Sequence, residues 1–157
     1  MKVVKRFLHI FFILVIFFLT GCAGQRYHRA SFEGTPFDWP LRGRLVLPFG
    51  SKEDGVTTKG ILVEGYEGQT VLASKDGKVV YVDEGLRGYG KTLILEHSGG
   101  FSTLYARNAE ILVSTGQQVR QGQPIARVGR AGKGGLPRAY FELRRSAKPE
   151  DPLLYFK

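Results

Sequence analysis

The stretch Arg138-Ala139-Tyr140-Phe141-Glu142-Leu143 decides how this sequence folds. Its side chains alternate between polar and apolar with a period of two, which predicts a half-buried β-strand. We expect the apolar side chains of this strand to face the core. The polar ones, Arg138, Tyr140 and Glu142, are expected to face a surface.

Short apolar runs separated by turn residues fill the chain from Leu41 onward. Glycine is abundant at 21 of 157 residues, and no segment has the pattern of an amphipathic helix, so the sequence predicts one all-β domain. The other strands are expected at Arg44–Leu47, Gly60–Val63, Thr70–Ala73, Lys78–Val82, Thr92–Glu96, Ser102–Ala106, Ile111–Val113 and Ile125–Val128.

The N-terminal residues have the pattern of a secretory leader. A basic start is followed by the apolar run Ile10–Leu19, whose ten residues are too few for a membrane-spanning helix. Leu19-Thr20-Gly21-Cys22 resembles the lipobox of bacterial lipoproteins, in which the cysteine thiol receives diacylglycerol. We therefore expect a signal peptide over 1–21, lipid attachment at Cys22, a linker over 22–40 and a folded domain over 41–157.

The lone cysteine and its neighbour bear on location. Because Cys22 is the single cysteine of the sequence, a disulfide within the chain is impossible. Acyl chains on Cys22 would anchor the protein stably to a membrane. Residue 23 is Ala rather than Asp, which by the enterobacterial sorting pattern indicates the outer membrane, with the domain facing the periplasm.

The charge is strongly positive and uneven. The formal net charge is +9, and eight basic residues stand against the single acid Glu142 in one C-terminal region: Arg120, Arg127, Arg130, Lys133, Arg138, Arg144, Arg145 and Lys148. Such a field favours an anionic partner, such as an acidic protein surface or the carboxylates of peptidoglycan peptides. The alternative is a solvated basic face without a dedicated partner.

Several motifs together resemble the zinc peptidases of the lysostaphin/LytM type. They are Pro48-Phe49-Gly50, Lys59-Gly60-Ile61, Thr103-Leu104-Tyr105-Ala106, Gly116-Gln117-Gln118-Val119 and Gly122-Gln123-Pro124-Ile125. The resemblance implies the LytM-type fold, an antiparallel β-sheet sandwich with a groove. Leu86–Gly90 and Tyr140–Arg145 are similar to the metal-free branch of that family, the murein hydrolase activators.

The resemblance also implies that the groove has lost its metal ligands. Where active relatives carry His-x-x-x-Asp, this chain has Thr58 and Leu62. Their Tyr-Ala-His ends here in Arg107, and their His-x-His becomes Arg138 and Tyr140. An arginine offers no lone pair to zinc and leucine offers none either. We therefore expect no catalytic residue, no metal site and no cofactor.

Other chemistry has little support in the sequence. His97 is the one imidazole of the folded domain, and beside the turn Ser98-Gly99-Gly100 a structural role is the simpler interpretation. A Ser/His/acid set of Ser98 or Ser102 with His97 and Asp83 rests on residue types alone. The glycines of Gly85–Gly90 lack the spacing of a phosphate-binding loop.

By resemblance, the groove residues Thr58, Leu62, Arg107, Arg138 and Tyr140 would bind and activate a zinc-dependent N-acetylmuramyl-L-alanine amidase. That amidase would split septal peptidoglycan during cell separation. Peptidoglycan and the membrane, reached through the lipid anchor, are the other partners expected, and nucleic acid is not. Two alternatives stay open: a peptidoglycan-binding or scaffold lipoprotein of the envelope, and a residual metalloendopeptidase.

Overall fold

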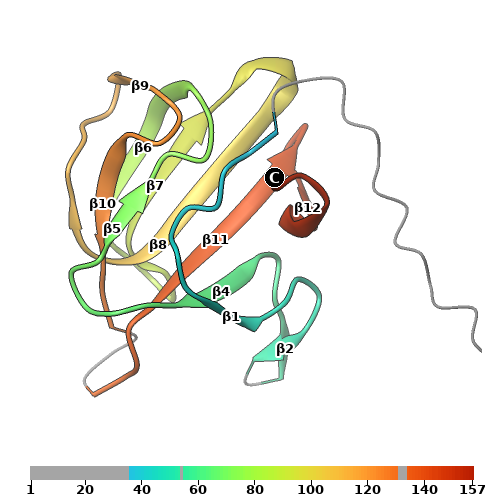
Figure 1. Ribbon diagram of the computed structural model, residues 1–157, viewed down its shortest axis with the longest axis vertical. Coiled ribbons are helices and arrows are strands. Elements are labelled where there is room, and N and C mark those ends of the chain that lie inside the picture. The colour runs from blue at the N-terminus through green and yellow to red at the C-terminus, as the bar shows by residue number, and fades with distance from the viewer. Residues whose placement is uncertain (1–35, 54, 131–133) are drawn as a thin grey trace, which may run out of the picture.

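The computed structural model describes residues 36–53, 55–130 and 134–157 (Figure 1). The predicted signal peptide, Cys22 and most of the predicted linker lie outside these residues. Strands occupy Arg44–Leu47 (β1), Lys52–Glu53 (β2), Val56–Thr57 (β3), Ile61–Glu64 (β4), Thr70–Leu72 (β5), Gly77–Leu86 (β6), Gly90–Glu96 (β7), Phe101–Ile111 (β8), Gln118–Val119 (β9), Pro124–Val128 (β10), Arg138–Arg145 (β11) and Lys148–Glu150 (β12).

Helical structure in the described part is limited to two 3-10 turns, Ser98–Gly100 and Pro152–Leu154. Among these residues no helix has the length and apolar character needed to cross a membrane.

The strands form one large antiparallel sheet. Its order is β1-β4-β11-β8-β7-β6-β9, while β10 pairs with β5 and β8, and β12 pairs with β11. β2 and β3 make a separate small hairpin. Every named strand pair is antiparallel, which confirms the predicted all-β antiparallel class. β11 lies between β4 and β8, so the predicted strand from Arg138 to Leu143 is an interior strand (Figure 1).

β8 is longer than predicted, because it continues through the polar residues that separate the two predicted segments Ser102–Ala106 and Ile111–Val113. Arg107 has a φ of 62°, a left-handed conformation that non-glycine residues seldom adopt. Before Arg107 the strand pairs with β11, after it the strand pairs with β10, and the pairing with β7 shifts register across Arg107. The strand therefore connects two parts of the sheet around a local bend.

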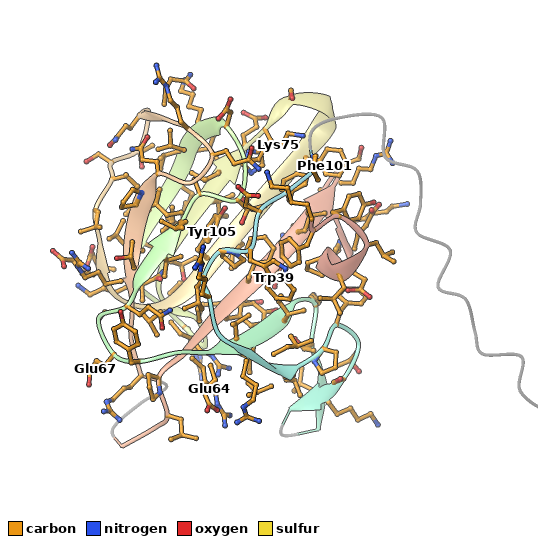
Figure 2. All side chains as sticks on the ribbon, viewed as in Figure 1. Trp39, Glu64, Glu67, Lys75, Phe101 and Tyr105 are labelled. Atoms are coloured by element: carbon orange, nitrogen blue, oxygen red, sulfur yellow. The ribbon has the colours of Figure 1, made fainter. Side chains whose placement is uncertain are left out.

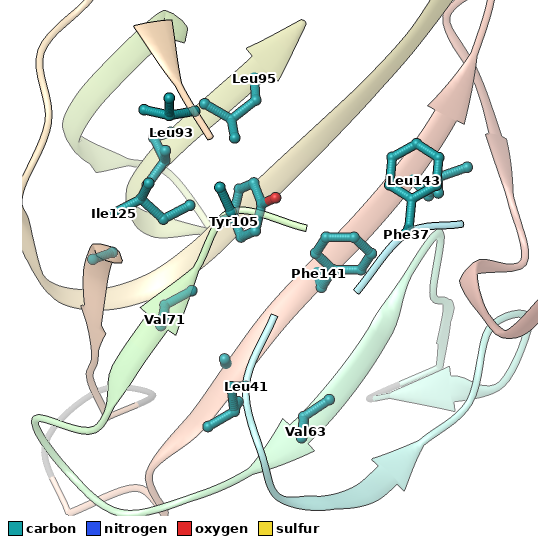
Figure 3. Close-up of a cluster of buried hydrophobic side chains, with 14 of the residues drawn as sticks. Phe37, Leu41, Val63, Val71, Leu93, Leu95, Tyr105, Ile125, Phe141 and Leu143 are labelled. Carbon is teal, nitrogen blue, oxygen red and sulfur yellow. The ribbon is translucent and has the colours of Figure 1, made fainter. Parts of the chain in front are cut away.

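The main core lies on the face of β11 that carries Phe141 and Leu143, both fully buried as predicted (Figure 3). Apolar residues of β4, β7, β8 and β10 pack in the same cluster, and Leu41 contributes from the N-terminal segment (Figure 3). The described members of this cluster run from Phe37 to Phe156, so residues 36–157 contribute a continuous apolar core.

The core also includes residues that the sequence prediction assigned to the linker. Phe37 is fully buried, and it forms a parallel bridge with Phe156 near the C-terminus. Trp39 lies over the sheet (Figure 2), with its ring stacked on that of Phe156 at a centroid distance of 4.4 Å. Asp38 forms a salt bridge of 3.0 Å with Lys157. The packed region thus extends past the predicted boundary at Leu41 to Phe37.

Candidate functional site

Three neighbouring strands bring most of the predicted site residues together. Tyr140 of β11 is paired in register with Leu62 of β4 on one side and with Ala106 of β8 on the other. Arg107 follows Ala106 directly. Thr58 lies just before β4, which is hydrogen-bonded to β11 within the same sheet.

This face of the sheet is an apolar cluster of its own. Leu62, Leu104, Ala106 and Tyr140 are all buried, and partly buried side chains of β1, β7 and the β6–β7 turn pack against them. Tyr89, in the β6–β7 turn, packs its ring edge-on against the ring of Tyr140, with centroids 5.5 Å apart. Because that turn covers β11, the expectation that the polar residues of this strand face a surface is wrong for Tyr140 and Glu142.

Glu142 is the charged residue at the centre of this arrangement. Its side chain is 0% exposed, and its two oxygens accept four hydrogen bonds. Oε1 accepts from the hydroxyls of Tyr140 at 2.7 Å and Tyr89 at 3.3 Å. Oε2 accepts from Nε and Nη2 of Arg144, at 2.7 and 2.5 Å. A buried carboxylate is tolerated when it is paired and hydrogen-bonded in this way.

The two tyrosines of this network resist ionisation. Burial, together with the hydrogen bond to Glu142 and its charge, raises the pKa of Tyr140 well above its usual range, and a hydrogen bond to Thr58 opposes this only in part. Burial and the charge of Glu142 also raise the pKa of Tyr89. Both hydroxyls therefore stay protonated near neutral pH, where they act as hydrogen-bond donors to the carboxylate.

The guanidinium of Arg107 lies over this cluster. It is 5.9 Å from the centroid of the Tyr140 ring, within the range of a cation–π contact. The backbone N–H of Arg107 donates to the carbonyl of Tyr89 at 2.8 Å, and its carbonyl accepts from the N–H of Gly129 at 2.9 Å. The half-exposed backbone of Arg107 is thus tied both to the β6–β7 turn and to the end of β10.

Arg138 lies apart from the cluster, beside Glu64. Its Nε is 3.8 Å from Glu64 Oε2, and Arg44 Nη2 is 3.1 Å from each oxygen of the same carboxylate. The Arg138 side chain is 31% exposed. Of the five predicted site residues, the structure therefore gathers Thr58, Leu62, Arg107 and Tyr140 and leaves Arg138 at the margin.

His97 has a structural position, as the sequence suggested. Its Nδ1 donates to the carbonyl of Asp76 at 2.8 Å, and its Nε2 is 2.7 Å from Thr103 Oγ1. Burial lowers the pKa of His97, and the nearby positive charge of Lys75 adds to the effect. Both ring nitrogens are occupied by these partners, so the Ser/His/acid set considered from the sequence is not assembled.

The described parts of the chain contain no group of three or more His, Cys, Asp or Glu side chains placed to hold a metal ion. The site offers an aromatic pair, Tyr89 and Tyr140, with the guanidinium of Arg107 over the Tyr140 ring. The buried carboxylate of Glu142 is paired with Arg144. Aromatic and arginine side chains are the groups that most often anchor protein partners.

Sequence reasoning missed Glu142, Arg144 and Tyr89 as members of this site. The alternation in β11 placed Glu142 on the face of Tyr140, which was a signal for their contact. Nothing in the pattern around Tyr89 showed that its turn folds over β11, because the partner strand is far away in sequence.

Comparisons with known proteins show the family and the fold of the chain. The sequence profile of Peptidase family M23 matches residues 56–152. A lipoprotein NlpD/LppB homolog of Pseudomonas aeruginosa is 44% identical over 117 residues, which are 74% of this chain and 38% of the relative. The murein hydrolase activators NlpD and EnvC of Escherichia coli are 40% and 43% identical over 117 and 115 residues. This chain covers 74% and 73% of its length in those matches, and 30% and 27% of theirs.

The chain therefore spans well under half the length of these relatives, which are named lipoproteins or activators rather than peptidases. Among solved structures, Csd3 of Helicobacter pylori has a TM-score of 0.69 at 25% identity, over 79% of this chain and 34% of that one. A zinc containing peptidase of Vibrio cholerae has a TM-score of 0.65 at 27% identity, over 75% and 39%. Since the profile covers more than half of its residues, the chain belongs to peptidase family M23.

Proposed function

We propose that this protein is a non-catalytic murein hydrolase activator, which binds a zinc-dependent N-acetylmuramyl-L-alanine amidase through the substituted peptidase site. The amidase would then split septal peptidoglycan as daughter cells separate. The names of the relatives NlpD and EnvC support an activator. The choice of an amidase as the partner follows the resemblance described above.

The observation that carries the proposal is the apolar environment of Leu62 and Tyr140. Zinc in a peptidase needs about three ligands from His, Cys, Asp or Glu and an open position for water. Leu62 and Tyr140 are register partners within a buried cluster, 1% and 8% exposed. The Tyr140 hydroxyl already donates to Glu142 Oε1 at 2.7 Å, so it is held by the network around that carboxylate. The residues of this site therefore do not supply the ligands that a zinc-dependent hydrolysis would need.

Activation needs only a difference in binding. If the amidase exists in a closed and an open form, a partner that binds the open form better shifts the population toward it. The side chains around Tyr140, with Arg107 and Arg138 presenting guanidinium groups, would supply that contact. Arginine adds fixed, planar donors suited to the carboxylates and carbonyls of a protein segment.

The test is dye release from labelled sacculi by residues 36–157, with and without the purified amidase of the same organism. The activator predicts release only when both proteins are present. Tyr140→Ala should reduce that release about tenfold or more, because it removes the ring on which Tyr89 and Arg107 pack. Tyr81→Ala, on β6 and outside the site, is the matched control. Release by residues 36–157 alone, with bound zinc, would support the residual endopeptidase instead.

Binding to sacculi without any stimulation of the amidase would support the scaffold lipoprotein.

We also propose that Cys22 carries a lipid that holds the protein in the outer membrane, facing the periplasm. Relatives named as lipoproteins support this, including an outer membrane antigenic lipoprotein of Haemophilus influenzae. Cys22→Ser should abolish fatty-acid labelling and release the protein from membranes. Unchanged labelling would refute the assignment.

A further inference from the structure

Glu142 is the residue of this site whose presence packing alone does not explain. It is fully buried beside the apolar cluster of Leu62, Leu104, Ala106 and Tyr140. Taking a carboxylate out of water is costly, and replacing a buried ion pair with apolar side chains of similar volume is often neutral or stabilising. The pair of Glu142 with Arg144 is therefore weak evidence for a role in stability, and another role has to be sought.

The two oxygens of Glu142 hold different parts of the structure. Oε2 receives both bonds from Arg144, two residues further along β11. Oε1 receives the hydroxyls of Tyr140, on the same strand, and Tyr89, in the β6–β7 turn. The rings of Tyr89 and Tyr140 are also in edge-to-face contact. Each ring is thus fixed twice, once through its face or edge and once through its hydroxyl.

We propose that Glu142 is a positioning residue, whose buried carboxylate holds the rings of Tyr140 and Tyr89 in the geometry that the protein partner binds. The inference rests on the proposed function, because it states how the same site is kept in shape. Glu142 is 0% exposed and Tyr140 is 8% exposed, so the partner would contact chiefly the half-buried Tyr89 and Arg107 that pack on Tyr140. Glu142 acts through the two hydroxyls.

Fixing these rings in advance matters for binding because ordering a side chain on association reduces affinity. Arg107 adds a second reason, since its guanidinium lies over the Tyr140 ring and would shift with that ring. The carboxylate also opposes ionisation of both hydroxyls, so they remain donors to it. A network in which every member is bonded is rigid, and losing one member loosens the others.

Glu142→Gln in residues 36–157 is the direct test. The substitution keeps the shape of the side chain but removes its charge, and one amide cannot accept from the tyrosines and from Arg144 at once. Loss of such charge-assisted bonds should weaken binding of the purified amidase about tenfold or more. Because changing one partner of a buried charged pair also destabilises the fold, binding is compared at a temperature at which circular dichroism shows both proteins folded. Amidase binding within twofold of the unsubstituted protein would overturn the proposal.

Asp83→Asn is the matched control. Tyr81 donates its hydroxyl to Asp83 Oδ2 at 3.0 Å, so Asp83→Asn makes the same carboxylate-to-amide change beside a tyrosine outside the site. Amidase binding should be unchanged in this variant. An equal loss in Asp83→Asn would show that the effect is general and would overturn a positioning role for Glu142.

A double-mutant cycle separates positioning from stability. If Glu142 acts through the Tyr140 hydroxyl, Glu142→Gln combined with Tyr140→Phe should cost little more amidase affinity than the larger single change. Full additivity would contradict the inference. If Glu142→Gln fails to fold, the double variant Tyr89→Phe/Tyr140→Phe replaces it, since it leaves the Glu142–Arg144 pair intact. Retained affinity in that variant would also refute positioning.

The outcomes also separate this inference from the function on which it rests. Full activation by a folded Tyr140→Ala variant would remove the proposed function and the inference together. Loss of activation in Tyr140→Ala with unchanged affinity in Glu142→Gln would remove the positioning role alone.

Discussion

At the scale of single residues, His97 shows how the fold fixes the protonation state of a side chain. The ring is 6% exposed, and it packs edge-on against Phe37 at a centroid distance of 5.5 Å. A carbonyl can only accept a hydrogen bond, so the contact with Asp76 requires a proton on Nδ1. A second proton on Nε2 would place a positive charge in a buried site near Lys75.

The lowered pKa of His97 makes stability depend on pH. In the unfolded chain His97 has the ordinary histidine pKa of 6.5, whereas in the folded chain its pKa is lower, so it binds a proton only at lower pH. Stability from the neutral ring is therefore complete above pH 6.5 and is lost as pH falls through the folded-state pKa. Urea unfolding midpoints measured from pH 7.5 downward should decrease in this window. His97→Gln should lack that component, and an identical slope in the variant would contradict the assignment.

At the scale of elements, the strand β11 shows what the sequence could and could not predict. Alternation from Arg138 to Leu143 located the strand and its core face, because apolar residues repeat with the period of the pleat. The other face was misjudged, because burial there depends on the β6–β7 turn and on Tyr89 within it. Coverage by a turn that is distant in sequence leaves no local signal. The short strands β2, β3, β9 and β12 were missed because two or three residues show no period.

The pairing of β4 with β11 leads to a second prediction, at Gly60. A Cβ at this position would lie 2.2 Å from the carbonyl oxygen of Phe141 and 2.8 Å from Cγ of Glu142. Because the nearest atom belongs to the backbone, the contact cannot be relieved by a rotamer change. Gly60→Ala should therefore destabilise the fold by about 1–3 kcal/mol, as overpacking does elsewhere, measured by urea unfolding.

Gly85 provides the control for Gly60, because a Cβ there meets no atom within 4 Å. Gly85→Ala should leave stability nearly unchanged or slightly raised. Equal stability of the two variants would show that β4 and β11 are less closely packed at Gly60 than the structure has them.

At the scale of the whole molecule, the two ends of the described chain close the core together. The backbone N–H of Phe37 donates to the carbonyl of Tyr155 at 3.0 Å, and that of Lys157 donates to the carbonyl of Phe37 at 3.2 Å. Residues 36–40 show no alternation, so no local pattern places them in the domain. Their partners lie at the opposite end of the chain, and such contacts are invisible to any local pattern.

This closure predicts that a chain beginning at Leu41 is much less stable than one beginning at Pro36. The shorter chain loses the fully buried ring of Phe37 and the stacking of Trp39 on Phe156. Removing a buried phenylalanine ring alone costs about 3–5 kcal/mol. A domain of this size has about 5–15 kcal/mol in total, so the loss is a large share of its stability. We expect a lower urea midpoint for the shorter chain, and Phe37→Ala in the longer chain should reproduce much of the decrease.

Asp38→Asn is the control for the neighbouring surface salt bridge, which should contribute at most about 1 kcal/mol. Equal urea midpoints for the two chains would mean that the core is stable without residues 36–40. The folded domain would then start at Leu41, as predicted from the sequence.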